Sequence, residues 1–391
     1  MSHTNYLIIG GGMTGAAAAN GIRELDPTGT ITIISADHEP PYNRPPLSKK
    51  LWGGKMTVEN IYVKLPLGIN LRLGHSVTAI DADARQVTDD SGAVTTYDKL
   101  LLATGGTPRH LPFGGNAVNY YRTLDGYRAL RTDADRGDKF LIIGGGFIGS
   151  EIAAALRKQG NQVTMVFPEP GICHRLFPAD MAAYVNDYYR QQGVEVLNDE
   201  SVTGIENSDG KAVVVTGSGR RIAVDRVVAG IGVIPDVALA EKAGLETGNG
   251  IVVNEYLRTS RPEIYAAGDV ANYPDAVLGV HRRVEHADAA RAMGRAAGRN
   301  MAGANEPYTY LPMFYSDLFD LGYEAVGQLD TRLDMVEDWQ DGYRHGAVYF
   351  MKEGRVVGVL LMDIWDRVDE ARALIEAGET VDPKSLIGRF K

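Results

Sequence analysis

The chain has 391 residues, enough for two or three domains with separate cores, and its 46 glycines suit several loops that bring backbone close to a ligand. Its formal net charge of −10 argues against a general nucleic-acid or anionic-membrane binder. Cys173 is its one cysteine, which excludes a disulfide framework or a structural zinc site within the chain. Without a signal peptide or an apolar run long enough to span a bilayer, a cytoplasmic protein is expected.

A dinucleotide-binding βαβ unit is predicted at the N-terminus. Its parts, in order, are a strand at 6–9, the glycines Gly10, Gly12 and Gly15, a helix at 16–25 and a strand at 31–34. In G-x-G-x-x-G the first glycine makes the tight turn, the second lets backbone approach a pyrophosphate, and the third lets the helix lie close on the strand. The acid that usually follows the second strand of this motif and binds the ribose is displaced, because Ala36 carries no carboxylate and Asp37 follows it. Either Asp37 or main-chain and water contacts would hold the ribose.

The proline-rich segment 38–52 is predicted to be an extended, rigid loop, because it has too many prolines for a helix or a central strand. Its basic residues Arg44 and Lys49 are either solvated surface charges or partners of a phosphate or a reduced, anionic ring. Proximity to a nucleotide turn favours the second interpretation. After sheet segments at 71–80 and 86–95, a buried strand at 99–103 ends in Thr104 and Gly105, which let backbone pass close to a cofactor.

The N-terminal pattern returns in full at 139–169. Its parts are a strand at 140–143, the glycines Gly144, Gly146 and Gly149, a helix at 150–158 and a strand at 163–167. Glu169 stands twenty residues after Gly149, where an acid accepts from an adenosine ribose 2′-hydroxyl and repels a 2′-phosphate. A lone glycine motif is a weak signal, whereas strand, glycines, helix, strand and acid in order predict a second dinucleotide site that prefers NADH.

The rest of the chain is predicted to complete these two domains and add a third. Gly232 follows a strand at 226–231. A further strand begins at Ile264 and is followed by Gly268 and Asp269, and Asp269 is placed to accept a hydrogen bond from a sugar-like hydroxyl. The other predicted elements are sheet segments at 193–202 and 211–224, a small-residue helix from about 284 to 301, antiparallel strands at 323–327, 347–351 and 355–362, and a helix at 367–377.

Several stretches carry a resemblance to a known family. They are PPYNRPPLSKKLW (40–52), LLATGGTPR (101–109), GGGFIGSE (144–151), VFPE (166–169), AAGDVA (266–271), RRVEHADAA (282–290) and MFYSDLFDLGYEAVG (313–327). In this order they resemble the apoptosis-inducing factor-like members of the FAD-dependent ferredoxin and rubredoxin reductases, which have the glutathione-reductase-like fold. The resemblance implies FAD in the first domain, NADH in the second, and a C-terminal domain that covers the flavin edge and is able to dock a protein partner.

The resemblance also implies roles for single residues. Lys49 and Glu151 match an ion pair beside the reactive face of the flavin, where a fixed cation favours the reduced, anionic ring. Phe147, next to Ile148 in the second turn, matches an aromatic near the nicotinamide, with core packing as the alternative. Tyr315 stands where the family commonly has Trp and is expected to cover the flavin. The residues matching FAD-contacting positions are Gly12, Arg44, Lys49, Arg128, Asp269, Glu285 and His286.

These observations predict an α/β protein with two Rossmann-like domains and a C-terminal α+β domain. The expected bounds are 1–117 with 241–304 for FAD, 118–240 for NAD and 305–391 for the third domain. The predicted function is electron transfer from NADH through FAD to a ferredoxin, a rubredoxin, a quinone or oxygen, by a monomer or homodimer. The alternative is an NADH-responsive redox sensor with a stable flavin–NAD charge-transfer complex. Having only Cys173 excludes a disulfide reductase with an intramolecular cysteine pair.

Overall fold

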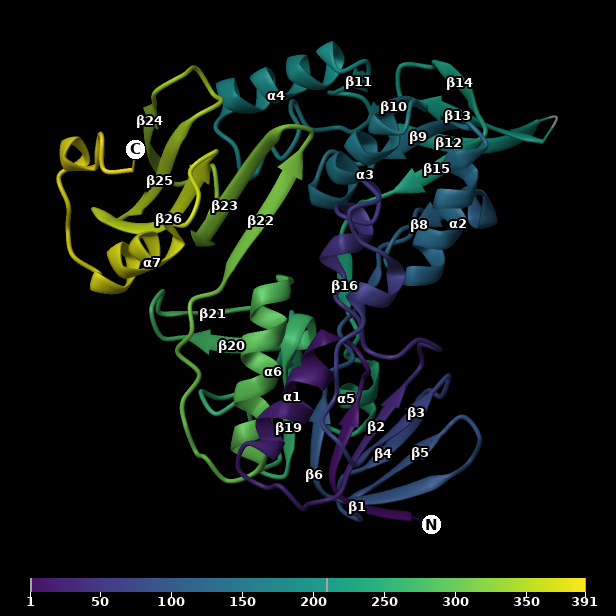
Figure 1. The fold of residues 1–391 in the computed structure, drawn as a ribbon, viewed down its shortest axis with the longest axis vertical. Coiled ribbons are helices and arrows are strands. Elements are labelled where there is room, and N and C mark those ends of the chain that lie inside the picture. The colour runs from purple at the N-terminus through teal and green to yellow at the C-terminus, as the bar shows by residue number, and fades with distance from the viewer. Residues whose placement is uncertain (1, 209, 391) are drawn as a thin grey trace. The chain divides into compact units, whose positions relative to one another are not determined.

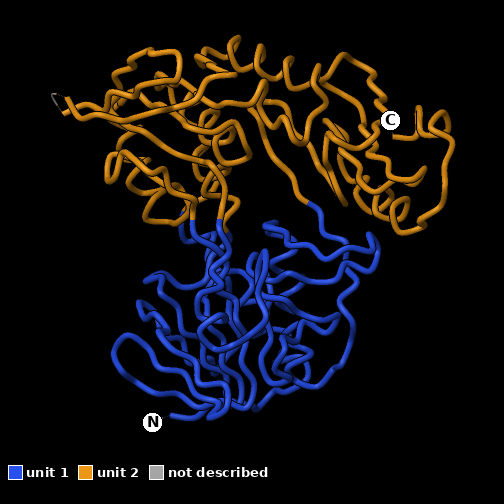
Figure 2. Tube along the Cα trace, turned by 180° about the vertical axis from the view of Figure 1, so that it is seen from behind, with its two compact units in different colours: residues 1–43, 58–107, 234–313 blue, residues 44–57, 108–233, 314–391 orange. Residues whose placement is uncertain are grey.

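The computed structural model describes residues 2–208 and 210–390, and contacts divide the chain into two compact units (Figures 1 and 2). Unit 1, blue in Figure 2, comprises residues 1–43, 58–107 and 234–313. Unit 2, orange in Figure 2, comprises residues 44–57, 108–233 and 314–391. The three domains expected from the sequence cut the chain at other places, since they group residues 44–57 and 108–117 with the segments of unit 1. Those bounds stay a prediction.

The core of unit 1 is a seven-stranded sheet of order β3-β2-β1-β6-β5-β4, with β19 also paired to β6. Strands β3, β2, β1, β6 and β19 pair in parallel, whereas β4 and β5 form an antiparallel extension on the first half of β6. Every residue of β2 is buried, as a central parallel strand covered on both faces requires. The strands are β1 (Ser2–Ile9), β2 (Ile31–Ser35), β3 (Ile69–Leu73), β4 (Val77–Asp81), β5 (Gln86–Asp89), β6 (Val94–Leu102) and β19 (Ile264–Ala266).

Two helices of unit 1, α1 (Met13–Arg23) and α6 (Ala287–Met301), pack backbone against backbone although they are far apart in sequence. A Cβ added at Gly294 would lie 2.4 Å from Thr14 O, and one at Gly298 would lie 2.1 Å from Ala18 O. Glycine is therefore what allows the helices to come this close. Unit 1 is completed by α5 (Ala238–Lys242), the strands β17 (Thr247–Gly248), β18 (Gly250–Val252), β20 (Ala271–Asp275) and β21 (Val280–Arg282), and the 3₁₀ turns η2 (Val58–Ile61) and η4 (Gly268–Val270).

Unit 2 contains a five-stranded parallel sheet of order β11-β10-β9-β15-β8 and a three-stranded antiparallel meander, β12-β13-β14. The strands are β8 (Val118–Tyr120), β9 (Lys139–Ile143), β10 (Gln162–Val166), β11 (Glu195–Leu197), β12 (Val202–Ser208), β13 (Lys211–Thr216), β14 (Arg221–Val224) and β15 (Arg226–Ala229). The helices are α2 (Leu124–Asp135), α3 (Phe147–Lys158) and α4 (Ala179–Gln191), with 3₁₀ turns η1 (Pro45–Ser48) and η3 (Gly115–Ala117).

The C-terminal part of unit 2 is a five-stranded sheet of order β22-β23-β26-β25-β24, seen with helix α7 in the light-green to yellow part of Figure 1. Its pairs β23–β26, β26–β25 and β25–β24 are antiparallel. The elements are β22 (Met313–Leu318), β23 (Leu321–Gly327), β24 (Asp334–Trp339), β25 (Gly346–Lys352), β26 (Arg355–Met362), α7 (Val368–Ala377) and the 3₁₀ turn η5 (Pro383–Leu386). The short strands β7 (Gly106–Pro108) and β16 (Val233–Pro235) lie where the chain passes between the units.

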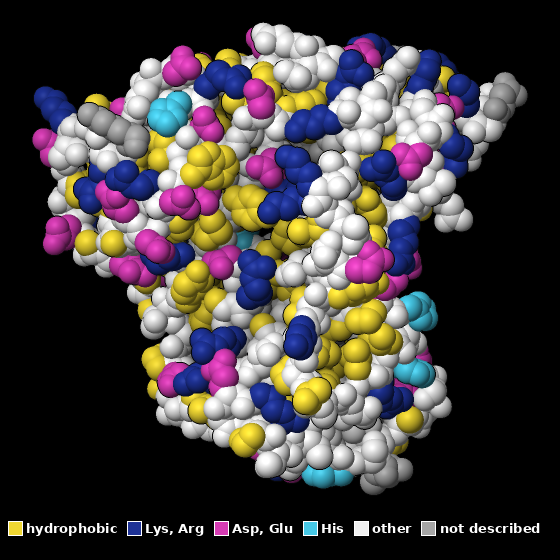
Figure 3. Space-filling model, viewed as in Figure 1, with side chains coloured by type: hydrophobic (Ala, Val, Ile, Leu, Met, Phe, Trp, Pro, Cys, Tyr) yellow, Lys and Arg dark blue, Asp and Glu magenta, His cyan; other side chains and the backbone are white. Residues whose placement is uncertain are grey.

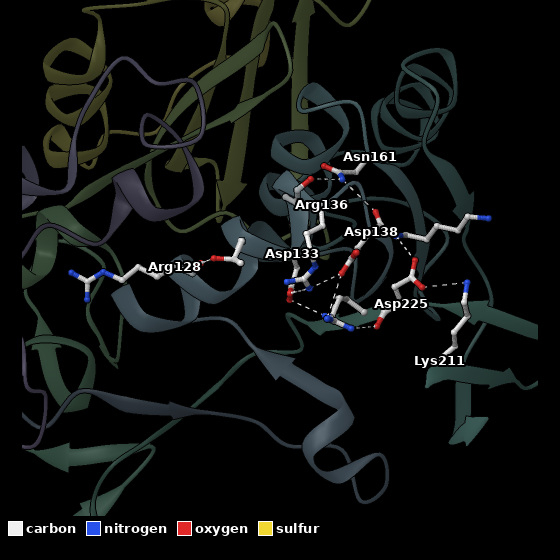
Figure 4. Close-up of polar contacts among 11 residues, drawn as sticks. Arg128, Asp133, Arg136, Asp138, Asn161, Lys211 and Asp225 are labelled. Atoms are coloured by element: carbon white, nitrogen blue, oxygen red, sulfur yellow. Dashed lines mark hydrogen bonds and ion pairs between the residues drawn. The ribbon is translucent and has the colours of Figure 1, made fainter. Parts of the chain in front are cut away.

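Charged residues close the amino-terminal edge of the parallel sheet in unit 2 (Figure 4). Asp133 and Asp138 both contact Arg136, and Arg226 pairs with Asp133 at 2.9 Å. The Asn161 amide donates to the Ala134 carbonyl at 2.9 Å. These residues tie α2 to the starts of β9 and β15, which is the edge opposite the one where parallel sheets bind nucleotides. Their role is therefore structural.

Both signs of charge mingle on the visible surface of each unit (Figure 3). The acidic side chains are interspersed with basic ones and do not form one large negative patch on this face of the molecule. Among residues 2–208 and 210–390, none of the helices has both the length and the apolar character needed to cross a membrane.

Most predicted elements are confirmed with shifts of a few residues, and β26 has the predicted bounds. One prediction was wrong: segment 38–52 is not extended throughout, because Pro45 and Pro46 begin the 3₁₀ turn η1. Proline fits the first positions of a helical turn, where its missing N–H has no partner to lose. Segments 71–80 and 86–95 are each divided by a turn, and helices α2 and α4 were not predicted.

Candidate functional site

The first glycine turn, in unit 1, has close backbone contacts at Gly10 and Gly15. Gly10 has a φ of +115°, and a Cβ there would lie 2.1 Å from Ala103 O at the end of β6. A Cβ at Gly15 would lie 2.1 Å from Gly10 O. Gly12 is the N-cap of α1, with φ −83° and ψ −168°. The turn therefore presents the first amides of α1 at the carboxyl ends of β1 and β6, where a pyrophosphate binds in this motif.

Asp37, the candidate for the displaced ribose acid, is already engaged by nearby donors. Its Oδ1 accepts from the Glu39 backbone N–H at 3.0 Å, and its Oδ2 accepts from the Tyr42 hydroxyl at 3.2 Å. A carboxylate has about four acceptor positions, so these bonds orient Asp37 and leave capacity for a ribose hydroxyl. The ribose role of Asp37 stays a prediction.

Asp269 and Glu285, two of the residues predicted to contact FAD, lie in unit 1 and are connected through Arg283. A Cβ at Gly268 would lie 2.2 Å from Thr14 Oγ1, so Asp269 follows a glycine that touches the start of α1. Arg283 donates to the Asp269 carbonyl at 2.9 Å and pairs with Glu285 at 2.6 Å.

Thr104 and Gly105 bind the segment that returns from unit 2. The Thr104 hydroxyl donates to the Asp236 carbonyl at 2.9 Å, and the Asp236 N–H donates to the Gly105 carbonyl at 3.1 Å. These contacts fix the backbone at the end of β6. The hydrogen of the Thr104 hydroxyl is already donated to Asp236.

His286 is the N-cap of α6. Burial lowers the pKa of His286 to about 4, and the positive charge of Arg282 acts in the same direction. The charges of Asp269 and Asp288 raise that pKa but do not outweigh burial. The imidazole is therefore neutral near pH 7 and can both donate and accept a hydrogen bond.

The second glycine turn, in unit 2, repeats the close contacts of Gly10 and Gly15. Gly144 has a φ of +108° and a Cβ there would lie 2.5 Å from Gly230 O, while one at Gly149 would lie 2.0 Å from Gly144 O. Gly146 has φ −81° and ψ −167°, and no atom of the described residues lies within 4 Å of its added Cβ. Gly232, also with open space at its Cβ, follows β15. Open space at Gly146 is what a pyrophosphate requires.

Side chains around the second turn are accessible. Phe147 is 40% exposed and stacks edge to face on Phe314 at 5.4 Å, and Ile148 is exposed as well, so neither is a core residue. Glu169 follows β10 and is half-buried. No described residue forms a hydrogen bond or ion pair with the Glu169 carboxylate. Its acceptor oxygens are therefore available to a ribose.

Lys49 and Glu151 form a buried ion pair within unit 2. Lys49 Nζ donates to Glu151 Oε1 at 2.5 Å, and the two side chains are only 8% and 5% exposed. Lys49 ends η1, and Glu151 lies in the first turns of α3. Lys49 Nζ also lies 5.2 Å from the centroid of the Tyr315 ring. The predicted pair is thus brought together, close to the second glycine turn.

The remaining predicted residues of unit 2 differ in their partners. Arg44 is half-buried and its guanidinium has no hydrogen bond or ion pair with any described residue, so it is available to an anion. Arg128 pairs with Asp125 at 3.0 Å on the surface of α2. Tyr315 is 37% exposed. Contacts of these residues with FAD stay predictions.

Cys173 is buried, and the charge of Glu151 acts on its thiol. Burial raises the pKa of the Cys173 thiol to about 12, and burial also raises the pKa of the Tyr323 hydroxyl well above its ordinary value. Both groups are neutral near pH 7. A thiolate, which disulfide chemistry needs, is therefore absent from this chain.

Sequence reasoning missed Ser48 and Ser316. Both hydroxyls donate to the Glu151 carboxylate at 2.5 Å. Ser48 precedes Lys49 in the same turn, and Ser316 follows Tyr315 in a strand. The alternation of a strand, with Tyr315 exposed and Ser316 buried, was the signal that could have found the second serine.

Three features fit two dinucleotides: open space at Gly146, and an Arg44 guanidinium and a Glu169 carboxylate that have no partner in the part of the chain that the structure describes. Together with two glycine turns on parallel sheets, they define a protein of the oxidoreductase class that binds two dinucleotides.

Comparison with known proteins gives the family. The Pyridine nucleotide-disulphide oxidoreductase family matches residues 4–294, and the C-terminal family of mitochondrion-associated apoptosis-inducing factor matches residues 297–341. The chain therefore belongs to the pyridine nucleotide-disulphide oxidoreductase family. It is an FAD-containing NAD(P)H oxidoreductase, and the family resemblance, the fold class and the two cofactors predicted from the sequence are confirmed.

Similar proteins include both ferredoxin-type reductases and apoptosis-inducing factors. The chain is 34% identical to apoptosis-inducing factor 1, mitochondrial, of Dictyostelium discoideum, over 96% of this chain and 79% of that protein. It is also 34% identical to the 5,5'-dehydrodivanillate O-demethylase ferredoxin reductase subunit of Sphingobium sp., over 99% and 96% of the two chains. The crystal structure of the covalent putidaredoxin reductase–putidaredoxin complex matches with a TM-score of 0.93 and 30% identity, over 100% and 97%.

Proposed function

We propose that this protein is an NADH-preferring reductase that passes electrons, one at a time or in pairs, to a small iron–sulfur carrier of the ferredoxin type. The observation that carries the proposal is the buried Lys49–Glu151 pair at the start of the helix that follows the second nucleotide turn. The names of two similar proteins, a ferredoxin reductase subunit and a reductase complexed with putidaredoxin, support this choice of acceptor.

Each residue has a defined task in this proposal. Bound FAD supplies the acceptance of hydride from NADH and the onward transfer of electrons. The Gly144–Gly149 turn seats the NADH pyrophosphate on the amides of α3, and Glu169 accepts from the ribose 2′-hydroxyl and repels a 2′-phosphate. Lys49 holds a positive charge that is 8% exposed, where water screens it poorly, and so favours negative charge nearby.

The proposal is tested by mixing the oxidised protein with NADH or NADPH without oxygen and following the flavin absorbance by stopped flow. The reduced protein is then mixed in turn with a two-iron ferredoxin, a rubredoxin, a quinone and oxygen. We expect faster reduction by NADH, and fastest reoxidation by the ferredoxin. Equal reduction by both nucleotides would refute the NADH preference.

The second candidate function, an NADH-responsive redox sensor, is favoured by the match of residues 297–341 to the apoptosis-inducing factor C-terminal family. It predicts a long-lived reduced complex with NAD that none of the four acceptors reoxidises. The same stopped-flow experiment therefore separates the two functions. A cytoplasmic location, with the protein as a monomer or a homodimer, completes the proposal.

A further inference from the structure

Glu151 connects three segments of unit 2 that are distant in sequence. Its Oε1 accepts from Lys49 Nζ and from Ser316 Oγ, and its Oε2 accepts from Ser48 Oγ, each at 2.5 Å. Ser48 lies in η1, Glu151 in α3 and Ser316 in β22. One carboxylate therefore holds the start of the nucleotide helix against a turn and a strand.

Burial explains why the two hydroxyls matter. Ser316 is fully buried, and Ser48 and the Glu151 side chain are nearly so. A buried ion pair is favourable only when hydrogen bonds satisfy the remaining lone pairs of its carboxylate. The serines supply these bonds without adding a second cation that would compete with Lys49. If either serine is lost, surrounding water cannot easily replace it, so the carboxylate gains freedom to move.

Ser316 also sets the orientation of its strand. Successive side chains of a strand point to opposite sides, so anchoring Ser316 inward turns Tyr315 outward, where it is 37% exposed. The centroid of the Tyr315 ring then lies 5.2 Å from Lys49 Nζ, and the Phe314 ring contacts Phe147 in the second glycine turn. A shift of one residue along β22 would exchange the two faces of the strand and lose both contacts.

We propose that Ser48 and Ser316 are positioning residues for the reaction, which act by fixing Glu151 and, through it, the Lys49 ammonium group. Ser316 has the larger effect, because it shares Oε1 with Lys49 and also fixes Tyr315. This inference rests on the proposed function, since it names the groups that hold the Lys49–Glu151 pair in place.

The test compares Ser316→Ala and Ser48→Ala with the matched control Thr216→Val. Thr216 is a buried hydroxyl at the end of β13, in the same unit, and its hydroxyl contacts Ser218 and Arg220 rather than Glu151. The first measurement is the rate at which acetic anhydride modifies Lys49 in the full-length protein, with and without flavin, determined by mass spectrometry. We expect the rate in the flavin-free protein to rise about fivefold in Ser316→Ala and less in Ser48→Ala. Thr216→Val should match the wild type.

The second measurement uses the flavin-loaded protein. Ser316→Ala should shift the flavin midpoint potential to a more negative value and slow the limiting rate of reduction by NADH about threefold, with little change in NADH affinity. Ser316→Thr, which retains a hydroxyl, should recover the wild-type potential. If Ser316→Ala does not fold, Ser48→Ala and Ser316→Thr carry the comparison.

Unchanged Lys49 modification and unchanged potential in the serine variants would overturn the inference. Failure of NADH to reduce the wild-type flavin would instead overturn the proposed function. The modification rate of Lys49 still tests the positioning in that case, because it does not depend on turnover.

Discussion

The two glycine turns have nearly the same backbone but different surroundings. Gly12 and Gly146, the N-caps of α1 and α3, differ by 2° in φ (−83° against −81°) and by 1° in ψ (−168° against −167°). The next two residues of α1, Met13 and Thr14, are buried, whereas Phe147 and Ile148 in α3 are exposed. The motif thus fixes the backbone conformation at the start of the helix, and the packing around the turn determines how exposed the turn is.

The surrounding elements explain this difference. Helix α6 lies on α1 with Gly294 against Thr14, and Gly268 touches the same threonine, so the first turn is enclosed within unit 1. Around the second turn, Gly146 has no neighbour at its Cβ among the described residues. We therefore expect the first turn to retain its nucleotide and the second to exchange it. Four experiments test this contrast between the two turns.

The largest effect is expected from alanine at the third glycine of each turn. A Cβ at Gly15 or Gly149 would lie 2.1 Å or 2.0 Å from a carbonyl oxygen, so each substitution forces the helix away at a cost of about 1–3 kcal/mol. Gly15→Ala should give protein without flavin. Gly149→Ala should keep its flavin, melt earlier and lose reduction by NADH. The measurements are the flavin-to-protein absorbance ratio and the melting temperature.

Gly146→Ala is the control for steric strain, since its Cβ has open space and should leave the melting temperature unchanged while weakening NADH binding. Equal loss of flavin from Gly15→Ala and Gly149→Ala would contradict the distinction between the turns.

The next effect compares the two acids. Glu169→Ala should weaken NADH binding by about 1.5–3 kcal/mol, roughly 10- to 150-fold, and narrow the preference over NADPH. Asp37→Ala should change FAD retention much less, because main-chain and water contacts are also able to hold that ribose. Dissociation constants from titration test both. An unaltered NADH to NADPH ratio in Glu169→Ala would refute the assignment.

A smaller effect is expected at the pair next to the second turn, which has no counterpart in α1. Lys49→Ala should slow flavin reduction about tenfold and lower its potential while FAD stays bound, because a carboxylate then faces the growing negative charge. Glu151→Ala should slow it less, since the cation remains. Reduction rates at saturating NADH measure both. Two variants with wild-type rates would mean that the pair is only a salt bridge.

The smallest effect is a pH dependence that belongs to unit 1. The folded-state pKa of His286, about 4, lies below its ordinary value of 6.5, so the unfolded chain takes up the proton first as pH falls. The free energy of unfolding of the flavin-free protein should therefore drop by about 1 kcal/mol per pH unit as pH falls from about 6.5 to about 4. Urea unfolding at several pH values measures this, and His286→Asn should flatten the dependence. In unit 2, Cys173 and Tyr323 have raised pKa values and do not respond in this range.

What could be predicted from the sequence follows from how local each constraint is. The glycine turns were predicted correctly, because strand, glycines and helix are contiguous and each glycine has its own steric reason. The Lys49–Glu151 pair came from a resemblance rather than from spacing, and Ser316 was missed because its contact depends on how a distant strand packs. Helix α4 was also missed, although the buried Met181, Val185 and Tyr188 lie at helical spacing.

The close packing of α1 on α6 has a consequence for how the protein is made. Strand β19 and helix α6 complete unit 1, yet they are encoded after the whole parallel sheet of unit 2. A ribosome therefore releases that sheet while the N-terminal strands still lack their final partners. We expect unit 1 to remain open to protease on stalled chains that end near residue 250 and to become protected only after about residue 310 has emerged, because contacts between distant residues form late. Retention of flavin by nascent chains should begin at the same length.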